Sequence, residues 1–278
     1  MILNLKKISA PQRQQLLQYV VAPRPICLAS TINEKGQVNL SPFSFFGLFS
    51  ASPPIVIFSA ALRMRDGSSK HTLKNVQEVP EVVIHIVEKE NLEQMNLSSA
   101  EFPKNINEFI KAGFTADPAT IVRPPMVREC RIKMECQVNE IKMLGQEGGA
   151  GNLIICEVLM IHMDDQIIDS KGMIRQQNIR HIARLGKNWY CQVSDENLFE
   201  VDKPSAELPV GVDGLPTAIR ESRFLSGANL AQLAAVHKLP RIDHSRTVNE
   251  EIHRLAKRLL DGGDTKLAWD LFAGEKQN

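Results

Sequence analysis

The fold class is decided by residues 26–59, which read ICLASTINEKGQVNLSPFSFFGLFSASPPIVIFS. Runs of β-branched, aliphatic and aromatic residues alternate here with turn signals: the runs lie at 26–31, 38–50 and 55–59, and the turns at 33–36 and 53–54. This spacing is typical of consecutive antiparallel strands. The stretch therefore predicts a domain built mainly from β-hairpins.

Further strands are predicted on the C-terminal side of this stretch. Residues 82–87 are apolar except for His85, residues 130–138 alternate apolar and polar side chains, and residues 153–162 follow a Gly-rich loop at 145–152. About six strands with few long helices between them favour a closed or nearly closed antiparallel barrel over a doubly wound parallel sheet. The predicted class is mainly β with peripheral helices.

The peripheral helices are predicted from start and stop signals. Residues 8–19 have Ser9 as a cap and a proline in the first turn, and residues 69–78 begin at Ser69. Residues 91–112 are expected to form one or two short helices that end at a glycine.

The character of the chain changes near residue 200. Residues 226–237, 249–260 and 265–272 have helical periodicity and are short and amphipathic, so they need a surface to pack on. We therefore predict a barrel domain over residues 1–200 and a C-terminal helical extension over residues 201–278. The extension is expected to pack on the barrel or on a partner subunit rather than to form a stable domain by itself.

Composition excludes several function classes. The chain has 278 residues, 43% of them hydrophobic, and Lys+Arg of 33 against Asp+Glu of 32 gives a net charge of +1. With only 5% aromatic residues as well, neither nucleic acid nor an anionic membrane is an expected partner. No signal peptide and no membrane span of roughly 18 apolar residues is present, so a cytoplasmic protein is expected.

Common catalytic and metal-binding signatures are absent from the sequence. It contains no GxSxG, GxxxxGK[ST], HExxH or strand-associated GxGxxG, and its seven histidines lack metal-ligand spacing. Five cysteines without a CxxC pair are expected to be buried free thiols. Neither a metal site nor a serine hydrolase is predicted.

One polar stretch is a candidate phosphate site. Residues 59–72 read SAALRMRDGSSKHT and bring hydroxyl groups, a glycine and three basic side chains to a predicted helix start. Backbone N–H groups, hydroxyl donors and positive charge together suit a phosphate. The alternative is a solvated basic loop with an ordinary helix cap.

Two further features allow either a functional or a structural interpretation. Residues 39–46, NLSPFSFF, contain a proline within the strand and could bend at a cavity edge or form an edge strand with core aromatics. Arg24, between Pro23 and Pro25, has a restricted backbone and could point into a site or cap carbonyl groups. His162 could line a substrate site or be a core residue with a satisfied hydrogen bond.

These residues resemble the flavin reductase-like, FMN-binding split-barrel family from about residue 10 to residue 195. The resemblance is carried by Pro23-Arg24-Pro25-Ile26 with Ser30-Thr31, Gly36, residues 39–46, Ser52-Pro53-Pro54, the Ser-Lys-x-Thr of residues 69–72, and Arg184-Leu185-Gly186 with Tyr190. It implies a six-stranded split barrel, usually a homodimer, with FMN in a cleft near the subunit interface.

The resemblance also implies roles for individual residues. The flavin and ribityl chain would be flanked by Asn39, Ser41, Phe43, Ser44 and Phe45, and the phosphate would be held by Ser59, Lys70, His71 and Thr72. Arg24 and Pro25 would lie near the ring system, and Arg184 and Tyr190 would approach it from the far side or from the partner subunit. Relatives commonly carry Asp where this chain has His71, which leaves the role of that side chain open.

The implied activity is an NAD(P)H-dependent flavin, ferric or other reductase, with hydride transferred through flavin N5. No protein general acid is required for that step; Arg24 is a candidate to stabilise charge at the N1–C2 edge, and His162 to line the substrate side. The alternatives are a non-enzymatic, flavoredoxin-like FMN electron carrier and an interaction protein with an empty pocket. The expected partners are a small-molecule donor and acceptor and a second copy of the chain.

Overall fold

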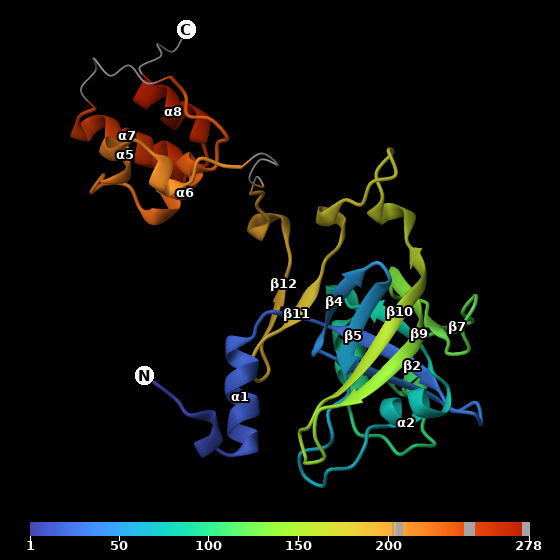
Figure 1. Cartoon of the computed structure of the whole chain (residues 1–278). Coiled ribbons are helices and arrows are strands. Elements are labelled where there is room, and N and C mark those ends of the chain that lie inside the picture. Colours follow the sequence, from blue (N-terminus) through green and yellow to red (C-terminus); the bar gives the residue numbers. More distant parts are fainter. Residues whose placement is uncertain (202, 204–207, 242–247, 274–278) are drawn as a thin grey trace. The chain divides into compact units, whose positions relative to one another are not determined.

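The computed structural model describes residues 1–201, 203, 208–241 and 248–273. The chain divides into two compact units, Met1–Leu198 and Phe199–Asn278 (Figure 1). The N-terminal unit contains the strands and the candidate site, and the C-terminal unit is helical.

A seven-stranded antiparallel sheet forms the barrel of the N-terminal unit, in the order β3-β2-β6-β9-β10-β5-β4. Its strands are β2 (Cys27–Ile32), β3 (Val38–Phe43), β4 (Phe46–Ala51), β5 (Pro54–Ser59), β6 (Glu81–Ile86), β9 (Ile132–Met143) and β10 (Asn152–Met163). The structure thus confirms the mainly β, split-barrel class, with one strand more than the predicted six.

The extra strand arises at Ser44 and Phe45. The sequence predicted one bent strand over residues 38–50, whereas the structure has β3 and β4, which lie at opposite edges of the sheet. Only these two residues connect β3 to β4. Because so short a link must join opposite edges of the sheet, the sheet curls and its two edges come close together. The amide of Ser59 donates to the carbonyl of Phe45 over 2.8 Å and fixes this crossing to β5.

Alternation along β2 separates two hydrophobic clusters. Cys27 and Ala29 contribute to the cluster inside the barrel, which contains the aromatic pair of Phe43 and Phe58. Ile26 and Leu28, at the intervening positions, contribute to a second cluster beneath the peripheral helices. Both faces of the strand are therefore buried, which fits the apolar run at residues 26–29.

The remaining elements of this unit are short. They are η1 (Leu5–Lys7), α1 (Ala10–Val20), β1 (Arg24–Pro25), α2 (His71–Glu78), η2 (Lys89–Asn91), α3 (Leu92–Ser98), α4 (Glu108–Ala112), β7 (Ala116–Asp117), β8 (Met126–Val127), η3 (Asp165–Ile167), η4 (Gln176–Asn178), β11 (Ile182–Arg184), β12 (Tyr190–Gln192) and η5 (Asp195–Asn197). Strands β1, β11 and β12 form a separate small sheet. The predicted cap at Ser69 is wrong: Lys70 is the N-cap of α2, and its side chain makes no capping hydrogen bond.

The C-terminal unit contains η6 (Val212–Gly214), α5 (Thr217–Arg220), α6 (Gly227–Ala234), α7 (Glu250–Asp261) and α8 (Thr265–Ala273). Its helices enclose a hydrophobic cluster of their own, in which Leu233 and Trp269 are buried and Leu230 and Val236 pack against it. The Trp269 Nε1 also donates to the Leu233 carbonyl over 3.2 Å. The helices therefore bury their apolar faces within the unit, and packing on the barrel or on a partner stays a prediction.

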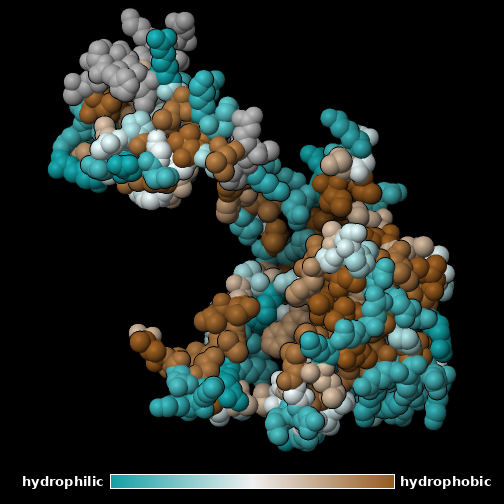
Figure 2. All heavy atoms as spheres, viewed as in Figure 1, coloured by the Kyte–Doolittle hydropathy of each residue, from teal (hydrophilic) through white to brown (hydrophobic). Residues whose placement is uncertain are grey.

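Apolar side chains also lie on the outside of the barrel. Strands β4 and β10 carry exposed Leu48, Phe49, Leu159 and Ile161, and Figure 2 shows apolar surface over this side of the N-terminal unit. β4 is an edge strand of the main sheet, so its outer backbone groups have no neighbouring strand.

Free thiols were predicted, and all five cysteines are free, four of them buried. Among the described residues, no group of histidine, cysteine and acidic side chains could hold a metal ion. No helix in the described ranges is long and apolar enough to cross a membrane.

Candidate functional site

Three adjoining hollows extend from β3 to the β11–β12 hairpin, and we call them together the β3 cleft. The first, of about 70 Å³, lies beside α2 and is lined by Asn39, Ser41, Arg63, Lys70, His71, Ser99, Ala100, Glu101, Phe102 and Glu108. The second, of about 170 Å³, is lined by Ile26, Pro42, Ser44, Met95, Asn96, Ser99, Arg184 and Tyr190. The third, of about 430 Å³, is lined by Leu92, Glu93, Asn96, Arg184, Asn188 and Tyr190. Shared lining residues show that each hollow borders the next.

The first hollow gathers three basic side chains, Arg63, Lys70 and His71, beside the carboxylates of Glu101 and Glu108. Lys70 Nζ lies 5.1 Å from the centre of the Phe43 ring, and Arg63 is held by bonds to the Ser68 hydroxyl (3.2 Å) and the Ser69 carbonyl (2.7 Å). Burial and then the nearby Arg63 charge lower the pKa of Lys70, and the same two causes lower the pKa of His71. A positive charge that lowers the pKa values of two neighbouring basic groups favours an anion at this place.

The start of α2 adds hydrogen-bond donors to this end of the cleft. The first N–H groups of a helix have no acceptor within the helix, and its N-terminus carries partial positive charge. Lys70 and His71 stand at this start, where they line the first hollow. The residues present therefore fit a phosphate group.

Thr72 contributes by holding Asn39. The Thr72 side chain is fully buried, and its hydroxyl accepts a hydrogen bond of 2.9 Å from Asn39 Nδ2. Asn39 itself lines the first hollow, whereas Thr72 lies behind it. The structure thus brings together two residues predicted for the site: Asn39 lines the cleft, and Thr72 holds the Asn39 side chain in place.

A flat aromatic surface lies at the opposite end. Arg184 and Tyr190 are register partners on β11 and β12, and the Arg184 guanidinium carbon lies 4.3 Å from the centre of the Tyr190 ring. Both line the second and third hollows, and Ser44 lines the second. This end can accept a planar ring system, while Asn39 and Ser41 line the first hollow beside the basic side chains.

Arg24 does not line the cleft. Its guanidinium is buried and donates to the carbonyls of Gln18 (2.6 Å), Val21 (2.5 Å) and Leu185 (2.9 Å). It therefore caps the end of α1 and ties it to the β11–β12 hairpin, the structural alternative that the sequence left open. Pro25 is exposed on β1 opposite Ala183 and also lies outside the cleft lining.

Three other predicted residues lie beside the cleft rather than in its lining. Phe43 is buried in the barrel core, where its ring centre is 5.1 Å from that of Phe58. Phe45 is 41% exposed near Arg24, with the guanidinium carbon 5.9 Å from its ring centre. Ser59 is nearly buried, and its hydroxyl lies so close to Gly151 that a Cβ there would approach to 2.8 Å.

His162 is part of a buried polar network. Its Nε2 lies 2.6 Å from Oε1 of Glu135, a fully buried carboxylate that also accepts from the amides of Thr120, Ile121 and Val122. These bonds hold the segment before β8 against the barrel. The contact favours the core interpretation of His162, which does not line the β3 cleft.

Sequence reasoning missed several cleft residues. Arg63 lies in the predicted phosphate stretch, and its position after an apolar strand was a usable signal. Asn96, Ser99 and Glu101 come from α3 and the segment after it, which is distant in sequence from both predicted binding stretches. Nothing local in their sequence indicated a binding role.

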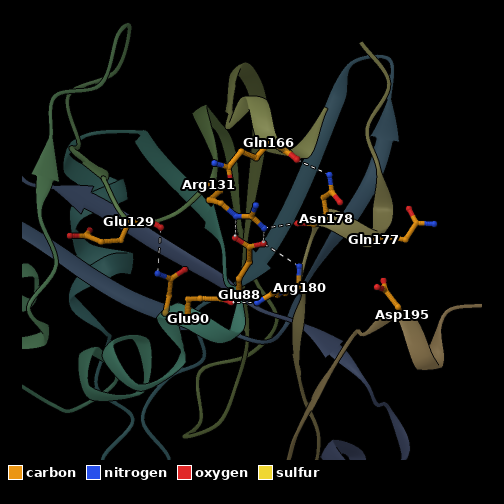
Figure 3. Close-up of a pocket in the computed structure, with 10 residues that line it drawn as sticks. Glu88, Glu90, Glu129, Arg131, Gln166, Gln177, Asn178, Arg180 and Asp195 are labelled. Atoms are coloured by element: carbon orange, nitrogen blue, oxygen red, sulfur yellow. Dashed lines mark hydrogen bonds and ion pairs between the residues drawn. The ribbon is translucent and has the colours of Figure 1, made fainter. Parts of the chain in front are cut away.

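A larger hollow, of about 620 Å³, lies near the end of β6 and the start of β9. Figure 3 shows that its charged groups face one another: Arg131 forms two bonds to Glu88 (2.8 and 2.5 Å), and Arg180 pairs with Glu90 at 2.8 Å. Both guanidinium groups are thus paired with carboxylates, as Arg63 is with Glu101 in the first hollow of the β3 cleft. The larger hollow lacks an aromatic lining residue, so the β3 cleft is the better candidate for a flavin nucleotide.

The comparisons with known proteins agree with this fold. The profile of the flavin reductase like domain matches residues 21–182. A relative from Halalkalibacterium halodurans is 34% identical over 207 residues, covering 74% of this chain and 97% of the relative.

Two solved structures are similar at 26% identity. Nitrilotriacetate monooxygenase component B from Bacillus cereus has a TM-score of 0.67 and covers 72% of this chain and 98% of its own. The 2-nitrobenzoate 2-nitroreductase of Pseudomonas fluorescens has a TM-score of 0.65 and covers 74% of this chain and 100% of its own. The split barrel, the profile match over more than half of the chain and these likenesses together establish that the chain belongs to the flavin reductase-like domain family.

Proposed function

We propose that this protein binds FMN in the β3 cleft and acts as an NAD(P)H-dependent reductase. The observation that carries the proposal is the order of chemistry along one groove. Cations and the start of α2 stand at one end beside Asn39 and Ser41, Ser44 lines the second hollow, and the Arg184–Tyr190 stack stands at the other end. A flavin mononucleotide has a phosphate, a ribityl chain and a planar ring in the same order.

The roles of the chain's residues follow from this placement. Lys70, Arg63 and His71 would hold the phosphate together with the first N–H groups of α2. Asn39 and Ser41 would face the ribityl hydroxyls. The bound flavin would supply the redox chemistry, accepting a hydride from a reduced nicotinamide and passing electrons to an acceptor.

The ring end leaves room for the electron donor. The third hollow is the largest of the cleft, at about 430 Å³, and is lined by the amides of Asn96 and Asn188 and by Tyr190. Amide groups and an aromatic face suit a nicotinamide ribose. Arg24 receives no electrostatic role in this proposal, because its Nη1 and Nη2 donate to backbone carbonyls and it does not line the cleft.

The family supports the proposal, because its domain is named for flavin reductases. Of the two similar structures, one is named as a monooxygenase component and the other as a nitroreductase. We also propose that two copies associate through the side of the barrel that carries exposed Leu48 and Phe49, because this apolar edge strand is otherwise open to pairing.

The test combines a binding and a turnover measurement on the purified full chain. Fluorescence titration should show FMN bound more tightly than riboflavin, and NADH or NADPH oxidation with FMN present should exceed the rate without protein. FMN binding without any nicotinamide oxidation would instead assign an electron carrier. A chain that binds none of FMN, FAD and riboflavin would overturn the proposal.

A further inference from the structure

Glu101 lies among the cations of the first hollow. Its carboxylate is 3.2 Å from Arg63 Nε and 2.7 Å from Arg65 Nη2, and it lines the hollow together with Lys70 and His71. Attraction to Glu101 opposes the lowering of the Lys70 pKa by burial and by Arg63. The negative charge of Glu101 therefore partly neutralises the site in which we place the FMN phosphate.

The Arg63 side chain is held in place by hydrogen bonds other than its contact with Glu101. Arg63 Nη1 donates to the Ser68 hydroxyl and the Ser69 carbonyl, and only 16% of its side chain is exposed. Glu101 and Arg65 are 50% and 70% exposed. Arg63 is thus a fixed donor, whereas Glu101 is a solvent-facing group that can turn away from it.

Glu101 belongs to the loop between α3 and α4. Residues 99–102 line the first hollow, and Ser99 also lines the second. With this segment in place the first hollow measures only about 70 Å³. Glu101 contacts Arg63 Nε, so a phosphate that binds this guanidinium would meet the Glu101 carboxylate, and the two anions compete for the same cation.

We infer that Glu101 occupies the anion position of the FMN phosphate in the free protein and sets the discrimination between FMN and riboflavin. The inference rests on the proposed function. FMN binding then exchanges one anion for another, because the phosphate takes over the Arg63 contact and Glu101 turns to solvent. Riboflavin has no phosphate and leaves the Glu101 contacts in place.

Two consequences follow from this exchange. Removing the carboxylate should strengthen FMN binding, because the ion pair with Arg63 no longer has to be broken and Glu108 is then the one carboxylate left in the lining of the hollow. It should also make FMN binding more sensitive to salt. In the variant the phosphate gains an attraction to Arg63 that salt screens, whereas in wild type the phosphate only replaces the Glu101 carboxylate, so the net attraction that salt can screen is smaller.

The test compares Glu101→Gln with wild type by flavin fluorescence titration at two salt concentrations. We expect roughly three- to tenfold tighter FMN binding in the variant, a modest change because the ion pair is half exposed. Riboflavin affinity should change less than twofold. The matched control is Glu90→Gln, which removes a carboxylate of similar exposure (54%) paired with Arg180 outside the cleft.

A second readout does not involve flavin. Inorganic phosphate should raise the melting temperature of Glu101→Gln more than that of wild type or Glu90→Gln. Glu101→Ala serves as a second variant if the amide forms new hydrogen bonds with Arg63.

The outcomes separate the two proposals. Unchanged or weaker FMN binding in both Glu101 variants, or equal strengthening for riboflavin, would overturn the inference and leave the proposed function intact. A wild-type chain that binds no flavin would overturn the proposed function, and the phosphate measurement would then decide whether Glu101 competes with an anion.

Discussion

Asn39 Nδ2 donates a hydrogen bond of 2.9 Å to the hydroxyl of Thr72, and both side chains are buried. This bond joins β3 to the first turn of α2, so the strand that lines the cleft and the helix that supplies its basic end are held in one geometry. A second buried amide–hydroxyl bond, from Asn75 to Thr31 (3.2 Å), joins the same helix to β2. The basic end is therefore a rigid part of the barrel.

The Asn39–Thr72 bond should matter for stability as well as binding. Thr72→Val keeps the shape but leaves the Asn39 amide without its acceptor, which should cost about 1–3 kcal/mol in the free energy of unfolding. FMN affinity should fall too, because Asn39 loses its orientation. Urea denaturation and flavin titration measure the two effects. Thr72→Ser retains the hydroxyl and should restore both, and equal losses in the two variants would contradict a role for the hydrogen bond.

Lys70→Ala should weaken FMN binding selectively. A charge-assisted bond to the phosphate is worth about 1.5–3 kcal/mol, or roughly a ten- to hundredfold change in the dissociation constant. Riboflavin binding should be nearly unchanged, because riboflavin lacks the phosphate. The matched control is Lys74→Ala, which removes an exposed lysine of the same helix outside the cleft lining. If FMN and riboflavin weakened equally, Lys70 would not contact the phosphate.

Arg24→Ala should act on structure rather than on the flavin. The substitution removes three hydrogen bonds to carbonyl groups at the end of α1 and in the β11–β12 hairpin. We expect a loss of about 2–4 kcal/mol in the free energy of unfolding. In conditions where the variant stays folded, FMN affinity should change far less than in Lys70→Ala. A large loss of flavin affinity without a loss of stability would restore Arg24 to the site.

His85 should make stability fall in mild acid. Its Nδ1 lies 2.8 Å from the Leu28 carbonyl, its Nε2 accepts from the Val127 amide (2.8 Å), and burial lowers its pKa from 6.5 to about 4. Between these values the unfolded chain binds more protons than the folded one, so stability is complete above pH 6.5 and decreases as the pH falls toward 4. The total contribution is roughly 3 kcal/mol.

Urea denaturation between pH 7.5 and 4.5 measures this dependence, with His85→Asn as the comparison. The variant should be less stable at neutral pH but should lose less stability on acidification, because the depressed group is gone. Parallel pH profiles for the two proteins would show that another group is responsible. His71, His181 and His253 also have lowered pKa values because of burial and contribute equally to both profiles.

Local patterning alone was sufficient for part of the main sheet. The apolar runs, the turn at 33–36 and the Gly-rich loop before β10 predicted β2, β5, β6 and β10 to within one residue of their observed limits, because side-chain burial and turn geometry act over a few residues. β9 instead extends to Met143, beyond the predicted end at residue 138, and the short strands outside the main sheet were not predicted. The helix end at Gly113 was predictable for the same reason, since its φ of 72° is one that glycine readily adopts.

The assignment of residues to the cleft needed the tertiary structure. The stretches 39–46 and 59–72 were identified as polar and unusual, but which of their side chains face outward depends on how the sheet curls. That curl buries Phe43 and Thr72 while it leaves Ser41, Lys70 and His71 in the cleft lining. Arg24 illustrates the same limit, because its carbonyl partners at Leu185 and Gln18 meet only when the small sheet forms.

What the sequence by itself determined was the mainly β class, the segment with the basic helix start, and the change to helices near residue 200. These follow from periodicity and composition, which are properties of neighbouring residues. Only the tertiary structure decided that β3 and β4 separate to opposite edges, that α3 and the segment with Glu101 form a wall of the cleft, and that the C-terminal helices share a core of their own. Those features come from contacts between residues far apart in the chain, whose pairing no local pattern encodes.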